Sequence, residues 1–113
     1  MDKLTTYQKL LKDTLTALAA LINRQPVPGV TAECALDDER GQYLLLTVGW
    51  SRNKRVRGTT VYVRLRDGKI WIEEDWTEEG ITSGLLKSGV PKEDIVLGFQ
   101  PPQMRPLTEF AVA

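Results

Sequence analysis

Four basic side chains fall within six consecutive positions of the sequence, in the stretch SRNKRVRGTT. They are Arg52, Lys54, Arg55 and Arg57. Guanidinium groups bind carboxylates and phosphates through paired hydrogen bonds, and ammonium groups bind both as point charges. Because the stretch lies between two predicted strands, we expect it to form a loop that protrudes from a hairpin. This loop is a candidate contact for a protein surface or for nucleic acid, or it is only a solvated loop.

A second hairpin is predicted directly afterwards, in TTVYVRLRDGKIWIEED. Its pair Asp67-Gly68 is the preferred two-residue type I′ turn, because both central positions of that turn need a positive φ. Such a turn fixes the register, so that Leu65 faces Ile70 and Val63 faces Ile72. These four side chains predict an apolar face.

The opposite face of this hairpin carries a second candidate contact, which consists of Tyr62, Arg64 and Trp71. The register places Arg64 opposite Trp71, which predicts a cation–π pair, and Tyr62 opposite Glu73. Protein interfaces concentrate arginine and aromatic side chains. The sequence leaves two interpretations open, in which this face is either an interface or is covered by another element.

The sequence contains no histidine and one cysteine. Ser-His-Asp and Cys-His relays and the histidine-containing zinc sites therefore cannot be built from this chain. The acidic trio Asp37, Asp38 and Glu39 fits a polar hairpin turn better than a metal site, because nothing nearby completes a cage. A carboxylate enzyme using Glu73 and Glu74 is the weakest hypothesis. We expect no catalytic residue, no cofactor and no metal.

The formal charge is zero, from 15 basic and 15 acidic residues, and the sequence pI is about 6.3. A domain built to neutralise phosphates usually has a pI above about 9, so the balance argues against nucleic acid as the main ligand. The charges are unevenly distributed, since 51–69 holds seven basic residues and one acidic residue, and 73–79 holds five acidic residues. This separation favours self-association or a charged protein partner at least as much as DNA.

We expect a cytoplasmic location without membrane contact. The longest apolar runs are far shorter than the roughly 20 residues that cross a bilayer, and the N-terminus lacks the apolar segment of a signal peptide. The lone Cys34 cannot form an internal disulfide, which fits a reducing compartment.

The periodicity predicts a single α+β domain over 1–113, with an antiparallel meander of four to five strands. An amphipathic helix is predicted over 3–23, because apolar residues recur there at steps of three and four. Alternation predicts strands at 30–37 and 42–50, and in the second of these Leu44, Leu46, Val48 and Trp50 share a face.

A second helix is expected after the fourth strand, from an N-cap at Thr77 to a left-handed Gly89. A fifth strand is predicted at 95–99. The proline-rich segment 100–107 is expected to be extended. The apolar residues after it either pack back on the domain or reach a partner.

Several longer strings resemble a known family. VGW at 48–50, DGKIWI at 67–72, GVPKEDIVLGFQPP at 89–102 and TEFAVA at 108–113 are similar to the XisI family, the cyanobacterial fdxN element excision controlling factors. The resemblance is close over 41–113 and looser before it. One departure is Gln100, where members often have histidine, so a titratable role there is absent from this chain.

The resemblance implies a small α+β domain with a regulatory role in the excision of a DNA element. In that system a separate recombinase performs the recombination, and XisI is an accessory factor that works with XisH, a nuclease-like protein. The resemblance brings no catalytic residues to carry over. We therefore expect a non-enzymatic accessory protein that acts through an XisH-like partner, with Arg52–Arg57 or the Tyr62, Arg64 and Trp71 face as its contact. The alternative is a weak DNA-binding accessory factor that places the basic loop 51–57 on phosphates.

Overall fold

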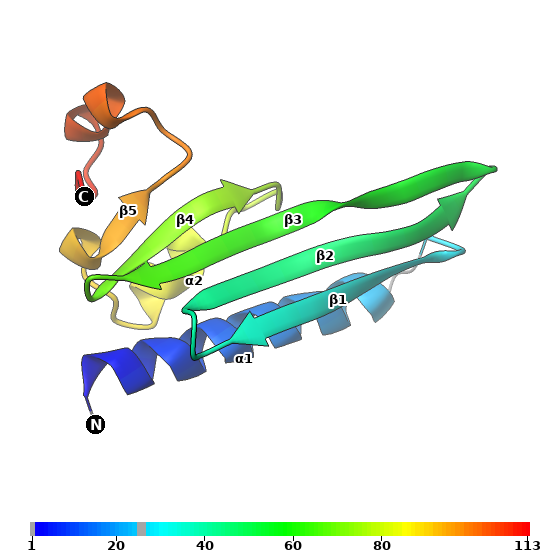
Figure 1. Cartoon of the computed structure of the whole chain (residues 1–113), viewed down its shortest axis with the longest axis horizontal. Helices are drawn as coiled ribbons and strands as arrows, with labels where there is room; N and C mark the ends of the chain where they lie inside the picture. The colour runs from blue at the N-terminus through cyan, green and yellow to red at the C-terminus, as the bar shows by residue number, and fades with distance from the viewer. Residues whose placement is uncertain (1, 25–26) are drawn as a thin grey trace.

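A long helix and a five-stranded sheet dominate the structure, a computed structural model that describes residues 2–24 and 27–113 (Figure 1). The helices are α1 (Lys3–Arg24), α2 (Thr82–Lys87) and the two 3-10 helices η1 (Lys92–Asp94) and η2 (Pro102–Leu107). The strands are β1 (Val30–Asp37), β2 (Gln42–Ser51), β3 (Lys54–Arg66), β4 (Lys69–Asp75) and β5 (Ile95–Leu97). The predicted α+β class is confirmed.

The strands lie in the sheet in chain order, β1-β2-β3-β4-β5. The first four pair antiparallel, as the predicted meander requires. Strand β5 pairs parallel to β4, with Ile70 opposite Ile95 and Ile72 opposite Leu97. A parallel neighbour needs a crossover connection, and the segment that contains α2 and η1 provides it.

The turn between β3 and β4 is the predicted one, because Asp67 and Gly68 both have positive φ, 54° and 75°. The predicted pairs Leu65–Ile70 and Val63–Ile72 are confirmed. The register prediction was wrong further from the turn, where Tyr62 pairs with Glu74 and not with Glu73. A β-bulge beyond Val63 inserts Glu73 as an extra residue, and a pattern of strict alternation does not reveal such an insertion.

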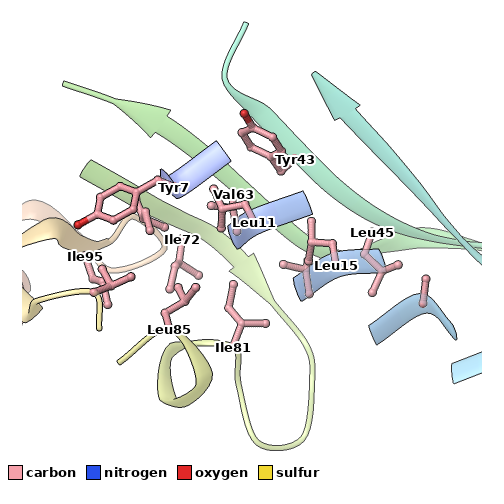
Figure 2. Packing of buried hydrophobic residues seen from close by; sticks show 14 of the residues in the cluster. Tyr7, Leu11, Leu15, Tyr43, Leu45, Val63, Ile72, Ile81, Leu85 and Ile95 are labelled. Atoms are coloured by element: carbon pink, nitrogen blue, oxygen red, sulfur yellow. The ribbon is translucent and has the colours of Figure 1, made fainter. Parts of the chain in front are cut away.

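The core lies between the sheet and the helices α1 and α2 (Figure 2). Tyr7, Leu11, Leu15 and Ala19 recur every four residues along α1 and are buried, so the amphipathic helix is confirmed. They pack with a cluster from the strands and from the segment around α2, which includes Tyr43, Leu45, Val63, Ile72, Ile81 and Leu85. Both α-helices therefore cover the same face of the sheet.

The predicted apolar stripe of β2 lies on the other face of the sheet. Tyr43 and Leu45 point into the core, so the alternating set of Leu44, Leu46, Val48 and Trp50 points away from α1. We call this side the outer face. Trp50 is 58% exposed there.

Helix α2 is shorter than predicted, because it begins at Thr82 and not after an N-cap at Thr77. The backbone N–H and hydroxyl of Thr77 both bond to Oδ1 of Asp75, and Oδ2 of Asp75 accepts the backbone N–H of Ile81. Gly80 has a φ of 75°, which interrupts a helix there. The predicted end is confirmed, since Gly89 has a φ of 98°.

The C-terminal segment packs back on the domain and is not extended at 100–107, where we predicted an extended chain. Residues Pro102–Leu107 form η2, because a proline at the start of a short helix removes only an N–H that would lack a partner. The backbone N–H of Ala111 then bonds to the Ile95 carbonyl at 2.9 Å, and Ala111 bridges to Val96. In the described part of the chain, no helix is long and apolar enough to span a membrane.

Candidate protein-interaction site

The basic cluster lies at the end of the β2–β3 hairpin and protrudes as predicted, but the prediction that the whole stretch forms a loop was wrong. The turn consists only of Arg52 and Asn53, whose φ angles are 52° and 64°. Ser51 pairs with Lys54, and β3 starts there, so Lys54, Arg55 and Arg57 are strand residues. Asparagine tolerates the left-handed conformation, which allows a two-residue turn without the usual glycine. We call residues 50–57 the hairpin tip.

The hairpin extends beyond the end of β4, as Figure 1 shows on its right side. Pairing between β3 and β4 covers only Val61 to Arg66 of β3. The last backbone contact on that side runs from the Trp76 N–H to the Thr60 carbonyl, at 2.8 Å. From Lys54 to Thr59, β3 pairs with β2 alone. We call Lys54–Thr59 the open edge.

An arginine–tryptophan pair lies at the hairpin tip on the outer face. Trp50 and Arg55 are cross-strand partners, and the Arg55 guanidinium carbon lies 5.6 Å from the centroid of the Trp50 ring. Arg55 Nη1 also donates to the Gly49 carbonyl at 3.4 Å. Gly49 itself is needed because a Cβ there would lie 1.9 Å from the Gly29 carbonyl oxygen. This close approach fixes the start of β1 against the strand that carries Trp50.

The four charges of the tip face solvent. Arg52, Lys54, Arg55 and Arg57 are all exposed, and none of the ion pairs formed by residues 2–24 and 27–113 includes them. Beside them, Leu46, Val48, Arg57 and Thr59 line a shallow hollow on the outer face. The tip thus presents guanidinium groups and an indole ring next to apolar side chains. The guanidinium groups are suited to bind carboxylates or phosphates.

The second candidate contact is divided by the structure. Arg64 and Trp71 are cross-strand partners, as predicted, but the predicted stacking between them is absent from the described contacts. The guanidinium carbons of Arg66 and Arg105 lie 5.6 and 5.3 Å from the centroid of the Trp71 ring. Arg64 Nε instead lies 2.9 Å from a Glu73 carboxylate oxygen. The bulge explains the difference, because the extra Glu73 stands beside Arg64. Tyr62 donates to the side-chain oxygen of Gln42 at 3.2 Å.

The chain's own C-terminal segment covers Trp71. Arg105 is held by three backbone carbonyls, those of Gln100 at 3.1 Å and of Gly98 and Val112 at 3.4 Å. The indole N–H of Trp71 is buried and has no hydrogen-bond partner in the described part of the chain. Sequence reasoning missed Arg105, whose only signal is a single arginine within the proline-rich segment. We call Trp71, Arg66 and Arg105 the Trp71 cluster.

A third group of polar residues joins α1 to η1. Tyr7 donates its hydroxyl to an Asp94 carboxylate oxygen at 2.5 Å, and Lys3 Nζ lies 3.1 Å from the same oxygen. Burial, and then the adjacent Asp94, raise the pKa of Tyr7. Burial alone would raise the pKa of Asp94, but Tyr7 and Lys3 outweigh it and hold that pKa below its ordinary value. With Tyr7 kept neutral and Asp94 ionised, this contact stabilises the fold.

Metal ligation has no candidate among the residues that the structure describes. Over residues 2–24 and 27–113, no three Cys, Asp or Glu side chains are placed to hold an ion.

The same fold occurs in two crystal structures of cyanobacterial proteins. One is a XisI-like protein from Anabaena variabilis, with a TM-score of 0.91 and 36% identity over 97% of this chain and 99% of that one. The other is the fdxN element excision controlling factor XisI from Anabaena variabilis, with a TM-score of 0.85 and 41% identity over 99% of this chain and 100% of that one. No curated relative matches the chain.

The family model described as XisI protein matches residues 1–112. The chain belongs to the XisI family, as the resemblance of its sequence implied.

Proposed function

We propose that this protein is a non-enzymatic regulatory factor of DNA-element excision that acts in the cytoplasm by binding a protein partner. Membership of the XisI family supports the regulatory role, since one solved member is described as an excision controlling factor. The observation that carries the proposed mode of action is the hairpin tip. There, an exposed Trp50 is stacked with Arg55 among charges that no acidic group of the described chain neutralises.

The tip is the preferred contact surface because arginine and tryptophan dominate the energetics of protein interfaces. Its unpaired charges also attract an acidic surface over a distance and raise the association rate. The second candidate face is less available, since Trp71 already stacks with two arginines and Arg64 already pairs with Glu73. The partner that we propose is an XisH-like, nuclease-like protein, and its contact residues on this chain are Arg52, Lys54, Arg55 and Arg57.

Co-expression with an XisH-like protein tests the proposal. We expect the two proteins to co-purify, and we expect capture to be lost when Arg52, Lys54, Arg55 and Arg57 are all changed to alanine. A matched control changes four exposed basic residues elsewhere, namely Lys9, Arg24, Arg40 and Lys87, and so alters the net charge equally. Failure of the wild-type proteins to co-purify, or equal loss with both quadruple variants, contradicts the proposal.

A second candidate function, weak DNA binding, is supported by the same unpaired charges. The four basic residues of the tip are free to neutralise phosphates. Neutralising three to four phosphates would make log K fall with log salt at a slope of roughly −3 to −4. A salt titration of duplex DNA measures this slope. An absence of binding at low salt would end this alternative.

A further inference from the structure

The open edge of β3 carries backbone groups that lack a partner among the described residues. The two-residue turn makes Ser51 and Lys54 the closing hydrogen-bonded pair of the hairpin. Bonding then alternates along an antiparallel strand, so Lys54, Val56 and Gly58 bond to β2. The N–H and C=O groups of the residues between them, which are Arg55, Arg57 and Thr59, point away from β2 into solvent.

The other two edges of the sheet are covered at least in part. On β1, the Asn23 side chain donates to the Ala32 carbonyl and accepts the Ala32 N–H, both at 2.9 Å. On β5, Ala111 bonds to the Ile95 carbonyl. Proteins usually block exposed edges because unpaired strands add further strands. The edge at Lys54–Thr59 has no such cover from any described residue.

A second copy of this chain does not fit the open edge. Antiparallel pairing about a two-fold axis would place Arg55 and Arg57 among the same arginines of the other copy. Like charges that face each other across paired strands are destabilising. The edge therefore requires a strand of opposite charge.

We propose that the open edge of β3 accepts an extended acidic segment of a protein partner as an additional strand. This inference rests on the proposed function and specifies how the partner binds at the tip. Six residues of β3 are available, which corresponds to a contact of about 20 Å. Main-chain hydrogen bonds to Arg55, Arg57 and Thr59 give affinity, and alternate side chains give specificity.

The side chains beside the open edge define what the added strand carries on each face. Arg55 and Arg57 lie on the outer face, so acidic side chains belong there. Val56 points to the opposite face and is half-buried, so an apolar side chain belongs beside it. At the inner end, Glu74 accepts a hydrogen bond from the exposed Trp76 at 2.5 Å. This carboxylate repels further acid, so the acidic positions belong near the tip.

Amide hydrogen exchange measured by NMR tests the proposal directly. The probe is an eight-residue synthetic peptide of alternating Glu and Val, added in excess to the isotope-labelled whole chain. We expect exchange of the Arg55, Arg57 and Thr59 amides to slow at least tenfold. The amides of Lys54, Val56 and Gly58 already bond to β2, and we expect a smaller change for them. Unchanged exchange at the three edge amides overturns the proposal.

Matched probes and variants separate strand addition from simple charge attraction. We expect no protection from an alternating Lys and Val peptide, or from a Glu and Val peptide with N-methyl groups on alternate amides. We also expect none in the variant Arg55→Glu/Arg57→Glu, whereas Lys9→Glu/Arg24→Glu behaves like the wild type. Equal protection by the basic peptide, by the N-methylated peptide or by duplex DNA contradicts the proposal.

The same measurement on the co-purified complex with the XisH-like protein distinguishes the two proposals. Protection of the three edge amides there supports strand addition by the natural partner. A complex that forms and leaves these amides unprotected overturns strand addition but keeps the proposed function. A failure to form any complex contradicts the proposed function. The peptide experiment then still decides whether the open edge accepts an acidic strand.

Discussion

Two arginine–tryptophan stacks lie on the outer face of the same sheet, and they differ in what surrounds them. Trp71 has cation–π contacts with both Arg66 and Arg105, and carbonyls of the C-terminal segment hold Arg105 in place. Among the described residues, Trp50 has a cation–π contact with Arg55 alone, and it is 58% exposed. The C-terminal segment covers the first stack, whereas the second is left open at the end of a hairpin.

Composition alone therefore does not distinguish a structural stack from a binding surface. Both stacks place arginine over an indole ring, which contributes about 0.5 to 1 kcal/mol when exposed and more when it is shielded from water. Only the open stack still has its contact energy available to a partner. Substitutions in the Trp71 cluster should therefore lower stability and leave partner binding at the tip unchanged. Substitutions in the tip should weaken partner binding and change stability little.

The largest expected effect comes from Trp71→Ala. We expect a loss of about 3 kcal/mol in the free energy of unfolding, because the change removes a large side chain that contacts both Arg66 and Arg105. Trp50→Ala should change stability by less than about 1 kcal/mol, since its ring is mostly exposed. Urea denaturation followed by circular dichroism measures both. Equal losses would contradict the distinction between the two stacks.

Asp94→Asn should have the next largest effect on the free energy of unfolding. We expect a loss of about 2 kcal/mol at pH 7, because the charged carboxylate accepts the Tyr7 hydrogen bond and pairs with Lys3. Asp13→Asn is the matched control, since Asp13 pairs with Lys9 on the exposed side of α1.

The effect of Asp94 should depend on pH. Its pKa is lowered in the folded state, so its contribution is present above the unfolded pKa and is lost as the pH falls through the lowered folded pKa. Urea midpoints of the wild type and Asp94→Asn should therefore converge between about pH 5 and pH 2. A constant difference across this range would show that the charge of Asp94 is not what stabilises the contact.

Arg105→Ala should destabilise by about 1 to 2 kcal/mol, through lost hydrogen bonds to carbonyls and lost stacking on Trp71. Arg105→Lys should recover only part of this, because an ammonium group cannot reach three carbonyls as a planar fork does. Full recovery with lysine would mean that charge alone holds the segment in place. Urea midpoints of the three proteins decide this.

The smallest effect on stability is expected for Arg55→Ala, less than about 1 kcal/mol, because the residue is exposed and its stack lies in solvent. The same change should weaken capture of the XisH-like partner, whereas Arg105→Ala should not weaken it at a temperature where that variant stays folded. Loss of capture with Arg105→Ala and not with Arg55→Ala would move the contact surface to the Trp71 cluster.

Much of the fold could be predicted where a local signal fixes geometry. The apolar spacing of α1 predicted its buried face, and Asp67-Gly68 predicted the register through Val63–Ile72. The prediction failed at Glu73, since a bulge is one extra residue that leaves no trace in an alternating pattern. Helix α2 starts late because the Asp75 side chain and the positive φ of Gly80 shape the connection before it.

The faces of β2 could not be assigned from sequence, because QYLLLTVGW is apolar on both sides. Pairing between Tyr43 and Val63 decides that Tyr43 and Leu45 enter the core, and this pairing joins residues far apart in the chain. The cover over Trp71 was missed for the same reason, since Arg105 lies in a segment with no periodicity. The sequence did identify the basic residues of the tip, although it misjudged the strand that carries them.

Capture of the XisH-like protein by the two quadruple alanine variants tests the central claim most directly. The wild type and the variant of Lys9, Arg24, Arg40 and Lys87 should co-purify with the partner. The variant of Arg52, Lys54, Arg55 and Arg57 should not, while it keeps its circular dichroism spectrum and urea midpoint. Full capture by the tip variant would contradict the claim that the hairpin tip is the site where this protein binds its partner.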